Sequence, residues 1–575
     1  MKNSRSLRIL WCGEASFLKT GYAIYAKELL SRLYGTGKYE IAEMGCYASH
    51  DNPEINKIPW RFYPTLPMNQ VEATAYNENQ SYQFGEWRFD DACLDFKPDV
   101  VIDIRDWWMV EYQGRSSFRK FYKWAIMPTV DSFPQQEQYI NSYIDADAVF
   151  TYSEFGKDVL EQESHGRIKI LGIPSPGANF ENLKPVNNKK QHRGSYGFMD
   201  DVNIIGTIMR NQRRKLYPNL IAAFRTMLDQ NPELHKNTFL YLHTSYPDLG
   251  WELPYFIKKY NMGNHTLITY KCTSCGHFFP SFYQGEKTSC SKCNMNTAQM
   301  PSASFGVTGK ELGAIINWFD LYVQYSVCEG FGMPQVEAAA CGVPVLTINY
   351  SAMQSVGEKI KADFIEPKAF FWDSPTHSKR AIPDDDELIE KIAKFIKLPA
   401  SMKSKRGMDC YMGVKKNYTW DGAATIWEDY LDQIDIMPYE DTWGSEPKIH
   451  QPADSIPDNI NNQEFINWAV TNIWGRPDQV NSYVAMKMLK DLNCGKTLNS
   501  GESIYYTEDS YVNSQQNYTA FGMNDAANKL INMCEHSNSL EQKRGEIMSN
   551  GWKNIGKPAF LSAVKSDSQT LAHVE

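Results

Sequence analysis

YSVCEGFGMPQVEAAACGVPVLT, residues 325–347, predicts a loop, a helix, a turn and a strand in that order. Pro334 suits the first position of a helix, where its missing backbone N–H costs nothing, and the helix is expected to stop at Gly342. VPVLT is short and β-branched, as in a buried parallel strand. A glycine-rich approach to a helix leaves N-terminal N–H groups and the positive end of the helix dipole free. The stretch therefore predicts a seat for an anion such as a diphosphate.

Two carboxylates, Glu329 and Glu337, flank this expected anion seat. Carboxylates beside a bound diphosphate are suited to hold sugar and ribose hydroxyls. The run EGFGMPQVEAAACGVPV resembles the Glu-x7-Glu signature of retaining glycosyltransferases with the GT-B fold, the family 4 type. The resemblance implies that Glu329 lies by the donor sugar and that Glu337 binds the ribose. It also implies that the backbone of Gly330, Phe331 and Gly332 faces the sugar and the phosphates.

The N-terminal half begins as a doubly wound α/β domain. LRILW (7–11) predicts a buried strand, CGEASFLKTGYA a glycine turn, and the chain to about Tyr34 an amphipathic helix. Gly21 would lie beyond the carboxyl end of that strand, where ligands bind in such sheets. It resembles the family's N-terminal glycine loop, which faces the donor phosphates and acceptor, but a plain turn between strand and helix is an equal alternative. Residues 45–90 show no clear period and predict a long loop region.

Further parallel strands are expected at DVVIDI (99–104), YKWAIMPTVD (122–131) and AVFTY (148–152). Many members of the resembled family carry a histidine that reaches the donor sugar, and Asp131 aligns with that position here. Its carboxylate would accept a sugar hydroxyl or act as a base toward the acceptor hydroxyl. The alternative is that Asp131 only caps a loop.

The second lobe is expected to open with NIIGTIM (203–209), followed by Arg210 and Lys215. This pair resembles the family's Arg and Lys clamp, which holds the donor diphosphate. No catalytic metal is expected, so fixed cations must neutralise the departing nucleoside diphosphate. Arg213 and Arg214 add positive charge to this segment, or, as the alternative, only face solvent. His243, at the end of the strand TFLYLHTSY, would contact base or sugar, or would be an ordinary core or surface histidine.

An insertion, KCTSCGHFFPSFYQGEKTSCSKCN, contains two CxxC pairs. Cys272 and Cys275 form the first pair and Cys290 and Cys293 the second, close to the spacing of a zinc ribbon. Full thiolate ligation leaves no open position, so we expect a structural zinc ion. The aromatic side chains between the pairs are interpreted as a small core or, alternatively, as a platform for a polymer acceptor: Phe278, Phe279, Phe282 and Tyr283.

The predicted fold class is α/β, a GT-B arrangement of two Rossmann-like doubly wound lobes facing a cleft, with a zinc-ribbon insertion and a helical C-terminal appendage. The acceptor lobe is expected first and the nucleotide-sugar lobe second, joined by a polar linker and closed by a helix that crosses back. The expected boundaries are 1–180 for the acceptor lobe, 181–200 for the linker, 201–420 for the nucleotide-sugar lobe, 268–300 for the zinc ribbon, 420–436 for the crossing helix and 437–575 for the helical region.

Composition is that of an ordinary globular chain. Hydrophobic residues make up 42% of the 575 residues and charged residues 22%, and the net charge is −9, which gives no overall basic footprint for nucleic acid. No apolar run of ~18 residues occurs, and the N-terminal apolar run ILWC is too short for a signal peptide. Of 12 cysteines, those outside the CxxC pairs are scattered, as in a protein with reduced thiols. We therefore expect a cytoplasmic location.

The sequence thus predicts a retaining glycosyltransferase that moves a sugar from a UDP- or GDP-linked donor, its co-substrate, to an acceptor hydroxyl. One alternative is an enzyme whose acceptor is a polymer such as hydroxymethylated, phage-type DNA, suggested by the ribbon aromatics and the basic 188–194 segment. The other is an inactive nucleotide-sugar binding or scaffold protein, suggested by the missing histidine. Saccharide, lipid-linked and protein acceptors stay open.

Overall fold

The structure, a computed structural model, describes residues 5–116, 118–302 and 305–444. The chain divides into two compact units, one made of Met1–Pro64, Ile102–Arg105 and Ala125–Asp435, and the other of Thr65–Val101, Asp106–Trp124 and the chain from Ile436. The helices expected in 437–575 fall outside the described residues from 445 onward. The expected domain boundaries stay predictions.

The first sheet has six strands in the order β3-β2-β1-β4-β5-β6. This is the strand order of a Rossmann fold, and β1 pairs with β2, β2 with β3 and β5 with β6 in the parallel sense. The strands are β1 (Leu7–Glu14), β2 (Tyr39–Cys46), β3 (Arg61–Pro64), β4 (Val100–Asp103), β5 (Lys123–Ile126) and β6 (Ala148–Val149).

Helices follow these strands where the sequence supplies a cap. The Thr20 hydroxyl accepts a hydrogen bond from the N–H of Ala23 at the start of α1, and Ser153 does the same for Gly156 at the start of α6. The helices of this half are α1 (Gly21–Gly35), α2 (Gln70–Glu78), α3 (Glu86–Phe96), α4 (Trp107–Gly114), α5 (Glu137–Ile144) and α6 (Glu154–Glu163).

The expectation of a long loop region over residues 45–90 is wrong. The structure places β3, α2 and the start of α3 there. Asn69 caps α2 by accepting from the N–H of Glu72, and Tyr76 is the buried side chain of α2, whereas α3 buries Phe89, Ala92, Cys93 and Phe96. Because α2 buries so little, its apolar period is weak in the sequence although tertiary packing stabilises it.

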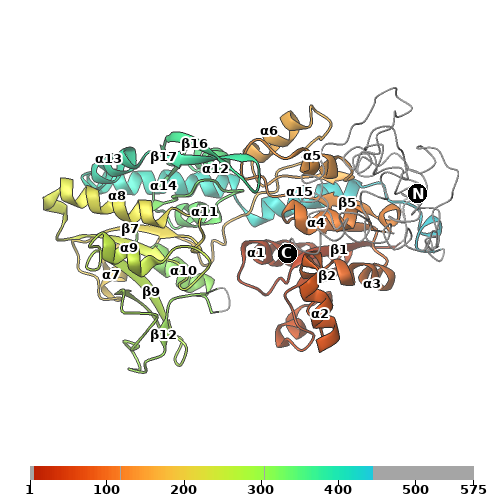
Figure 1. The fold of residues 1–575 in the computed structure, drawn as a ribbon, viewed down its shortest axis with the longest axis horizontal. Helices are drawn as coiled ribbons and strands as arrows, with labels where there is room; N and C mark the ends of the chain where they lie inside the picture. Colours follow the sequence, from red (N-terminus) through yellow and green to blue (C-terminus); the bar gives the residue numbers. More distant parts are fainter. Residues whose placement is uncertain (1–4, 117, 303–304, 445–575) are drawn as a thin grey trace, which may run out of the picture. The chain divides into compact units, whose positions relative to one another are not determined.

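The second sheet repeats the same plan. Its parallel strands follow the order β9-β8-β7-β13-β14-β15, again a doubly wound arrangement (Figure 1). These strands are β7 (Asn203–Ile208), β8 (Thr238–His243), β9 (Thr266–Cys272), β13 (Leu321–Val323), β14 (Val345–Ile348) and β15 (Asp363–Ile365).

Four helices of this half, α8, α9, α12 and α13, pack on the sheet through a shared apolar core. Asp384 caps α13 by accepting from the N–H groups of Asp386 and Glu387, so the acidic run at this point is a helix start. The helices are α7 (Lys189–Gly194), α8 (Tyr217–Gln230), α9 (Leu253–Lys259), α10 (Gly309–Ile316), α11 (Met333–Ala340), α12 (Ser351–Lys359), α13 (Asp385–Ile396), α14 (Ala400–Asn417) and α15 (Trp420–Gln433).

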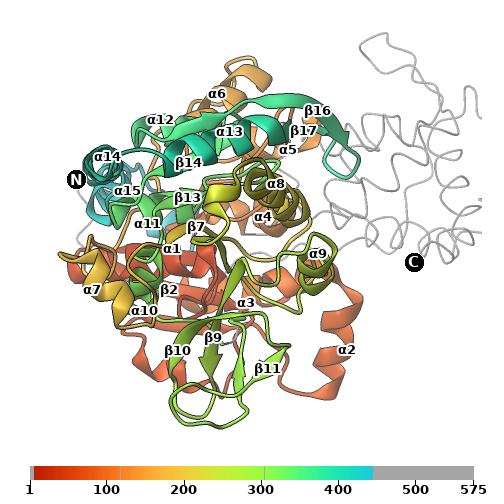
Figure 2. The same ribbon diagram turned by 90° about the vertical axis from the view of Figure 1, so that its left-hand side faces the viewer.

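The four-cysteine ribbon (residues 268–300) is a continuation of the second sheet. Strand β9 carries Cys272 at its end, and β10 (Phe278–Phe282) and β12 (Ala298–Gln299) both pair with β9 in the antiparallel sense. Strand β11 (Lys287–Thr288) pairs with β12. Figure 2 shows β9, β10 and β11 running together away from the helices.

A separate two-stranded hairpin, β16 (Pro367–Asp373) and β17 (Ser378–Pro383), precedes α13. Helix α15 lies against α1, since Trp427 donates to the hydroxyl of Tyr25 at 2.9 Å and Arg32 pairs with Asp421 at 2.7 Å. The chain thus returns from the second sheet to the first. None of the helices in the described ranges is both long and apolar enough to cross a lipid bilayer.

Candidate active site

The loop and helix expected around Pro334 are confirmed with one small shift. Helix α11 begins at Met333, so Pro334 is its second residue and still occupies a position without an intrahelical N–H partner. Gly332 caps the helix with φ 82° and Gly342 follows it with φ 69°, and both angles favour glycine. Of residues 333–335, Pro334 has no N–H and the Gln335 N–H donates to the carbonyl of Gly332 at 3.1 Å, so the N–H of Met333 is the one left at the start of α11.

Glu329 lies almost fully buried just before this helix. The Lys215 ammonium forms an ion pair with its carboxylate, and both side chains are 7% exposed. Gln324 donates from Nε2 to Oε1 of Glu329 at 2.9 Å, and the Glu329 N–H donates to the Ser351 hydroxyl at 3.1 Å. Lys215, Gln324 and Ser351, from three separate segments, thus hold Glu329 in one orientation.

The clamp expected of Arg210 and Lys215 is only half assembled. Arg210 forms its ion pair with Asp248, at 3.0 Å, and its side chain is 51% exposed. Arg214 instead approaches Glu329, with 3.9 Å between Nη2 and Oε2. Arg214 therefore does not only face solvent, because its guanidinium lies beside the Lys215–Glu329 pair.

Glu337 differs from Glu329 in having no cation beside it. Burial raises the pKa of its carboxyl from 4.5 to about 7, and among the described residues the carboxylate makes no hydrogen bond. A buried carboxylate without donors is costly unless a ligand supplies them. Its position on α11, four residues after Met333, suits it to receive hydroxyl groups from a ligand seated at the helix start.

Segments far apart in the sequence meet at Gly330. A Cβ atom added there would lie 2.4 Å from Cγ2 of Thr129, so only glycine permits this approach. Thr129 is in turn bonded to the Tyr22 hydroxyl at 2.7 Å, and Gly21 has Met333 as its neighbour at 3.7 Å from a built Cβ. The start of α1 and the glycine loop therefore lie together. The Phe331 side chain is buried against Tyr418, which leaves only its backbone for a ligand.

Asp131 does lie at this junction, but it is already paired. Its carboxylate binds the Arg380 guanidinium at 2.7 Å and accepts from Ser132 at 2.8 Å and from the Cys328 thiol at 3.3 Å. Burial acts to raise its pKa, but Arg380 and these hydrogen bonds outweigh burial and hold the pKa below its ordinary value. Arg380 was missed in the sequence because it lies in a hairpin that matches no motif.

His243 lies at the carboxyl end of β8, and Nδ1 is 2.9 Å from the hydroxyl of Thr269 on β9. Burial lowers its pKa from 6.5 to about 4, so the imidazole is neutral at neutral pH. A neutral ring can donate or accept one hydrogen bond from its other nitrogen, but it does not add to the positive charge for a diphosphate.

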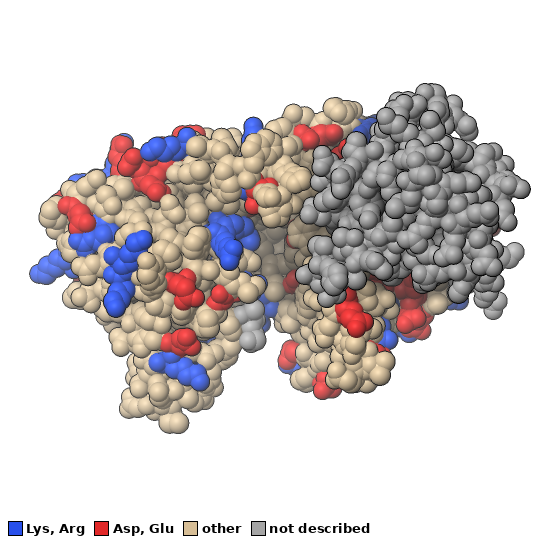
Figure 3. Space-filling view, viewed as in Figure 1, with Lys and Arg blue, Asp and Glu red and all other residues tan. Residues whose placement is uncertain are grey.

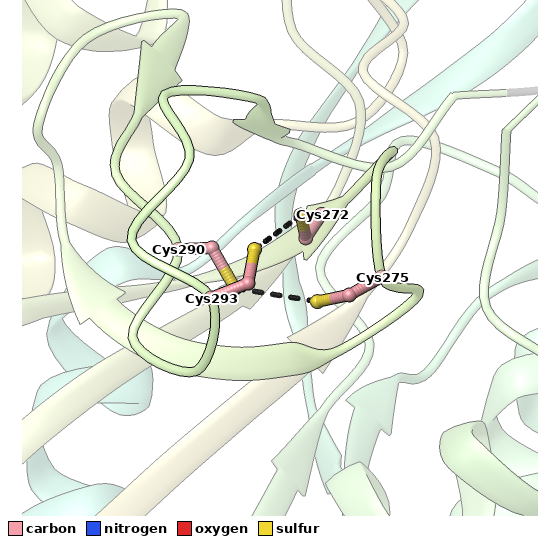
Figure 4. A group of neighbouring side chains, drawn as sticks. All are labelled: Cys272, Cys275, Cys290 and Cys293. Carbon is pink, nitrogen blue, oxygen red and sulfur yellow. Dashed lines mark hydrogen bonds between the residues drawn. The ribbon is translucent and has the colours of Figure 1, made fainter.

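The four cysteines converge as their spacing predicts (Figure 4). All four Sγ atoms lie within 4.8 Å of one another, with 3.7 Å between Cys272 and Cys293 and 3.6 Å between Cys275 and Cys290. A tetrahedral zinc ion with Zn–S bonds of about 2.3 Å separates its sulfur atoms by about 3.8 Å. A disulfide would need about 2.05 Å. The arrangement therefore fits a tetrahedral metal ion.

The ribbon aromatics pack inward. Phe279 and Tyr283 lie against the core of the second sheet, Phe278 stacks near Trp318, and Phe282 lies near Phe239. These contacts fit the first of the two interpretations, in which the aromatic side chains form a small core. The basic 188–194 segment is also engaged, because Lys189 and Arg193 pair with Asp320 and bind backbone carbonyls.

The model of the family described as glycosyl transferases group 1 matches residues 303–406. This span contains Glu329, Glu337 and Arg380, but neither the 210–215 segment nor the cysteines. No curated protein sequence matches the chain.

Solved structures share the fold at low sequence identity. A sucrose-phosphate synthase from Thermosynechococcus elongatus has a TM-score of 0.55 at 16% identity, over 74% of this chain and 98% of that chain. A UDP-forming trehalose-phosphate synthase from Burkholderia xenovorans has 0.52 at 11%, over 75% and 99%. Anabaena HepE, in complex with UDP and glucose, has 0.50 at 13%, over 74% and 100%. The fold is GT-B, and with the family match it establishes a glycosyltransferase domain in this chain.

Proposed function

We propose that this enzyme is a retaining, family 4-like glycosyltransferase that uses a UDP-linked sugar and transfers the sugar to an acceptor hydroxyl. The observation that carries the proposal is the Lys215–Glu329 ion pair just before the start of α11. The same helix carries Glu337, whose carboxylate has no hydrogen-bond donor among the described residues. Two of the similar structures, Anabaena HepE in complex with UDP and glucose and the UDP-forming trehalose-phosphate synthase, support uridine over guanosine as the base.

Different residues bind different parts of the nucleotide-sugar donor. The diphosphate binds at the positive N-terminal end of α11, at the N–H of Met333, and Lys215, with Arg214 beside it, balances the charge that grows on the leaving phosphate. Arg210 adds a second cation when it leaves Asp248. Glu337 accepts the ribose hydroxyls. Glu329 and the backbone of residues 330–332 orient the sugar, and Gly21 and His243 line the phosphate and base ends.

In the transfer step, the bond between the anomeric carbon and the β-phosphate oxygen breaks, and a bond to the acceptor oxygen forms on the same face. The acceptor proton passes to the departing phosphate, so no protein base is required. This agrees with Asp131, whose ion pair with Arg380 makes its carboxylate a weak base.

We propose that Cys272, Cys275, Cys290 and Cys293 hold a structural zinc ion. The four thiolates complete its coordination, so the ion stabilises the end of β9 and takes no part in transfer.

No observation favours the DNA-acceptor alternative. The ribbon aromatics and the basic segment are engaged within the lobe, and on the face drawn in Figure 3 acidic and basic side chains are interspersed over the described part of the chain. The inactive-protein alternative rests on the missing histidine, and the experiment below separates it from the enzyme.

The test is a thermal-shift panel of UDP, GDP, UDP-glucose and GDP-mannose on wild type, Lys215→Ala and Glu337→Gln. Lys236→Ala, an exposed lysine before β8, is the matched control. A ligand at about 100 times its Kd adds about 2.7 kcal/mol of stability. We expect UDP compounds to stabilise wild type and the control, and both site variants to lose most of that shift. Stabilisation without any release of glucose from UDP-glucose would favour the inactive alternative, and no stabilisation by any nucleotide would refute the donor site.

A further inference from the structure

The β16–β17 hairpin joins segments that the reaction must keep together. The N–H of Val327 donates to the carbonyl of Arg214 at 3.0 Å, the N–H of Ala381 donates to the carbonyl of Val327 at 3.0 Å, and the N–H of Lys379 donates to the carbonyl of Phe133 at 2.8 Å. Three backbone hydrogen bonds therefore connect the 214–215 segment, the loop before Glu329, strand β17 and the segment that carries Asp131.

Arg380 lies between the two residues of β17 that make these bonds. Its Nη1 donates to Asp131 at 2.7 Å and to the sulfur of Cys328 at 2.6 Å, and its Nη2 donates to the Thr376 hydroxyl at 3.2 Å. Asp373, cross-strand within the hairpin, adds a carboxylate 3.6 Å away. The Arg380 side chain is only 10% exposed, so its charge depends on these partners.

Cys328 is the residue directly before Glu329, and its thiol donates to Asp131 while its sulfur accepts from Arg380. One guanidinium thus fixes both the carboxylate that aligns with the family histidine and the residue next to the sugar-facing glutamate. Removing one member of such a buried pair leaves an uncompensated charge that the site must relax to solvate.

We propose that Arg380 is a positioning residue for sugar transfer, which holds the Cys328–Gly332 loop against the Thr129–Ser132 segment through Asp131 and Cys328. The inference rests on the proposed function and assigns Arg380 no contact with the substrate. A misplacement of about 1 Å at such a loop costs about 100-fold in rate, because the reacting atoms lose their alignment.

The charges around Asp131 give the proposal a pH signature. The groups that face it are Arg380, the Cys328 thiol, Lys215 and Tyr350, with Arg214 acting on Cys328 and Asp373 on Arg380. Without the Arg380 charge, burial dominates and the Asp131 carboxyl protonates at a higher pH. Protonation removes the uncompensated Asp131 charge, so the activity of an Arg380→Met variant should recover as the pH falls, relative to the dependence that Glu337 gives wild type.

The experiment compares full-length wild type with Arg380→Met, Arg380→Lys and the double variant Arg380→Met/Asp131→Asn. Arg406→Met is the matched control, since Arg406 pairs with Asp363 at 2.6 Å in the same lobe, away from the loop. UDP-glucose hydrolysis is measured over about pH 5 to 8, UDP affinity by titration, and amide deuterium exchange of residues 325–333 and 377–383 in the ligand-free protein.

We expect Arg380→Met to lower kcat by about tenfold or more while the Kd for UDP changes by less than about threefold. Relative to wild type it should also regain activity toward low pH, a trend that the double variant removes, and exchange faster at 325–333. Arg380→Lys should recover part of the rate because its ammonium still pairs with Asp131, and Arg406→Met should match wild type.

Unchanged kcat, pH profile and exchange in Arg380→Met would overturn the proposal, as would a loss of UDP affinity equal to the loss of kcat. If Arg380→Met melts too low to assay, Arg380→Lys decides with the same readouts. If wild type neither binds UDP nor hydrolyses UDP-glucose, the proposed function fails, while the exchange in ligand-free protein still decides whether Arg380 holds the loop.

Discussion

The four-cysteine ribbon and the donor centre (Lys215, Glu329, Asp131 and Arg380) are built in different ways, since the ribbon lies within the second lobe whereas the donor centre also takes Asp131 from the first. The ribbon takes all its ligands from residues 272–293, so local turns alone bring the thiols within 4.8 Å of one another. The donor centre collects partners from four separate stretches. Its geometry therefore depends on the tertiary fold and, at Asp131, on the hairpin.

Charge is balanced differently in the two regions. In the ribbon the ligands are all thiols, and four thiolates need a cation that the chain does not supply. In the donor centre each buried carboxylate already has a cation, Lys215 for Glu329 and Arg380 for Asp131. Loss of a single member should thus empty the ribbon of its metal but leave a buried unpaired charge in the donor centre.

The largest expected effect is in the ribbon. Cys272→Ser should abolish binding of one equivalent of zinc and lower the melting temperature by on the order of 10 °C, because Cys272 ends β9 and its metal stabilises the edge of the sheet. Zinc content is measured by mass spectrometry and melting by circular dichroism. Chelation of wild type should give the same fall.

Cys410→Ser serves as the control, since Cys410 is a buried thiol on α14 outside the cluster and should retain the zinc. A Cys272→Ser protein that keeps one equivalent of zinc would contradict the four-thiolate site.

In the donor centre, Lys215→Ala should lower the free energy of unfolding by about 3–5 kcal/mol, because it leaves the Glu329 carboxylate buried without its cation. Arg210→Ala removes an ion pair whose arginine is 51% exposed, and should cost only about 0.2–1 kcal/mol. Both variants should lose UDP affinity. Urea unfolding and UDP titration measure the two effects.

Equal stability losses in the two variants would show that Lys215 and Glu329 are not a buried pair. Full UDP affinity in Arg210→Ala would remove Arg210 from the proposed clamp and leave Arg214 as the second cation.

The contrast also explains what the sequence could predict. The strands at LRILW and VPVLT, the turn at Gly342 and the convergence of the cysteines all depend on neighbours in the chain, and the sequence shows them. The pairing of Arg210 with Asp248 and of Asp131 with Arg380 depends on residues 38 and 249 positions away, which no local pattern encodes. Helix α2 was missed because it buries only Tyr76.

A close approach between distant segments gives an intermediate effect. Gly330→Ala should lower the free energy of unfolding by about 1–3 kcal/mol, because its Cβ would lie 2.4 Å from Cγ2 of Thr129. Thr129→Ser removes that methyl group and keeps the hydroxyl that bonds Tyr22. The double variant should therefore recover most of the stability and of the UDP affinity.

A double-mutant cycle on urea unfolding measures this coupling, which is expected at about 0.5–3 kcal/mol. Additive losses in the double variant would mean that the two segments do not touch, and would weaken the convergence on which the donor site depends.

The smallest expected effect is the pH dependence of UDP binding through Glu337, the one carboxylate of the signature without a cation. Burial raises its pKa to about 7, so the free protein carries a neutral carboxyl below that pH and a carboxylate above it. Only the carboxylate accepts both ribose hydroxyls. Affinity for UDP should therefore rise by roughly five- to tenfold as the pH rises through about 7, and level off above it.

The sign for stability is the opposite. The folded pKa lies above the ordinary 4.5 of an unfolded chain. Ionisation of Glu337 therefore makes the ligand-free protein less stable as the pH rises from 4.5 to about 7. Glu337→Gln should flatten both trends, whereas any dependence from the phosphates of UDP is shared by the two proteins and cancels in the comparison. Titration of UDP at several pH values with both proteins measures the difference. If the pH dependence persisted unchanged in Glu337→Gln, another group would cause it and Glu337 would not bind the ribose. The contrast between the paired Glu329 and the unpaired Glu337 would then have no functional meaning.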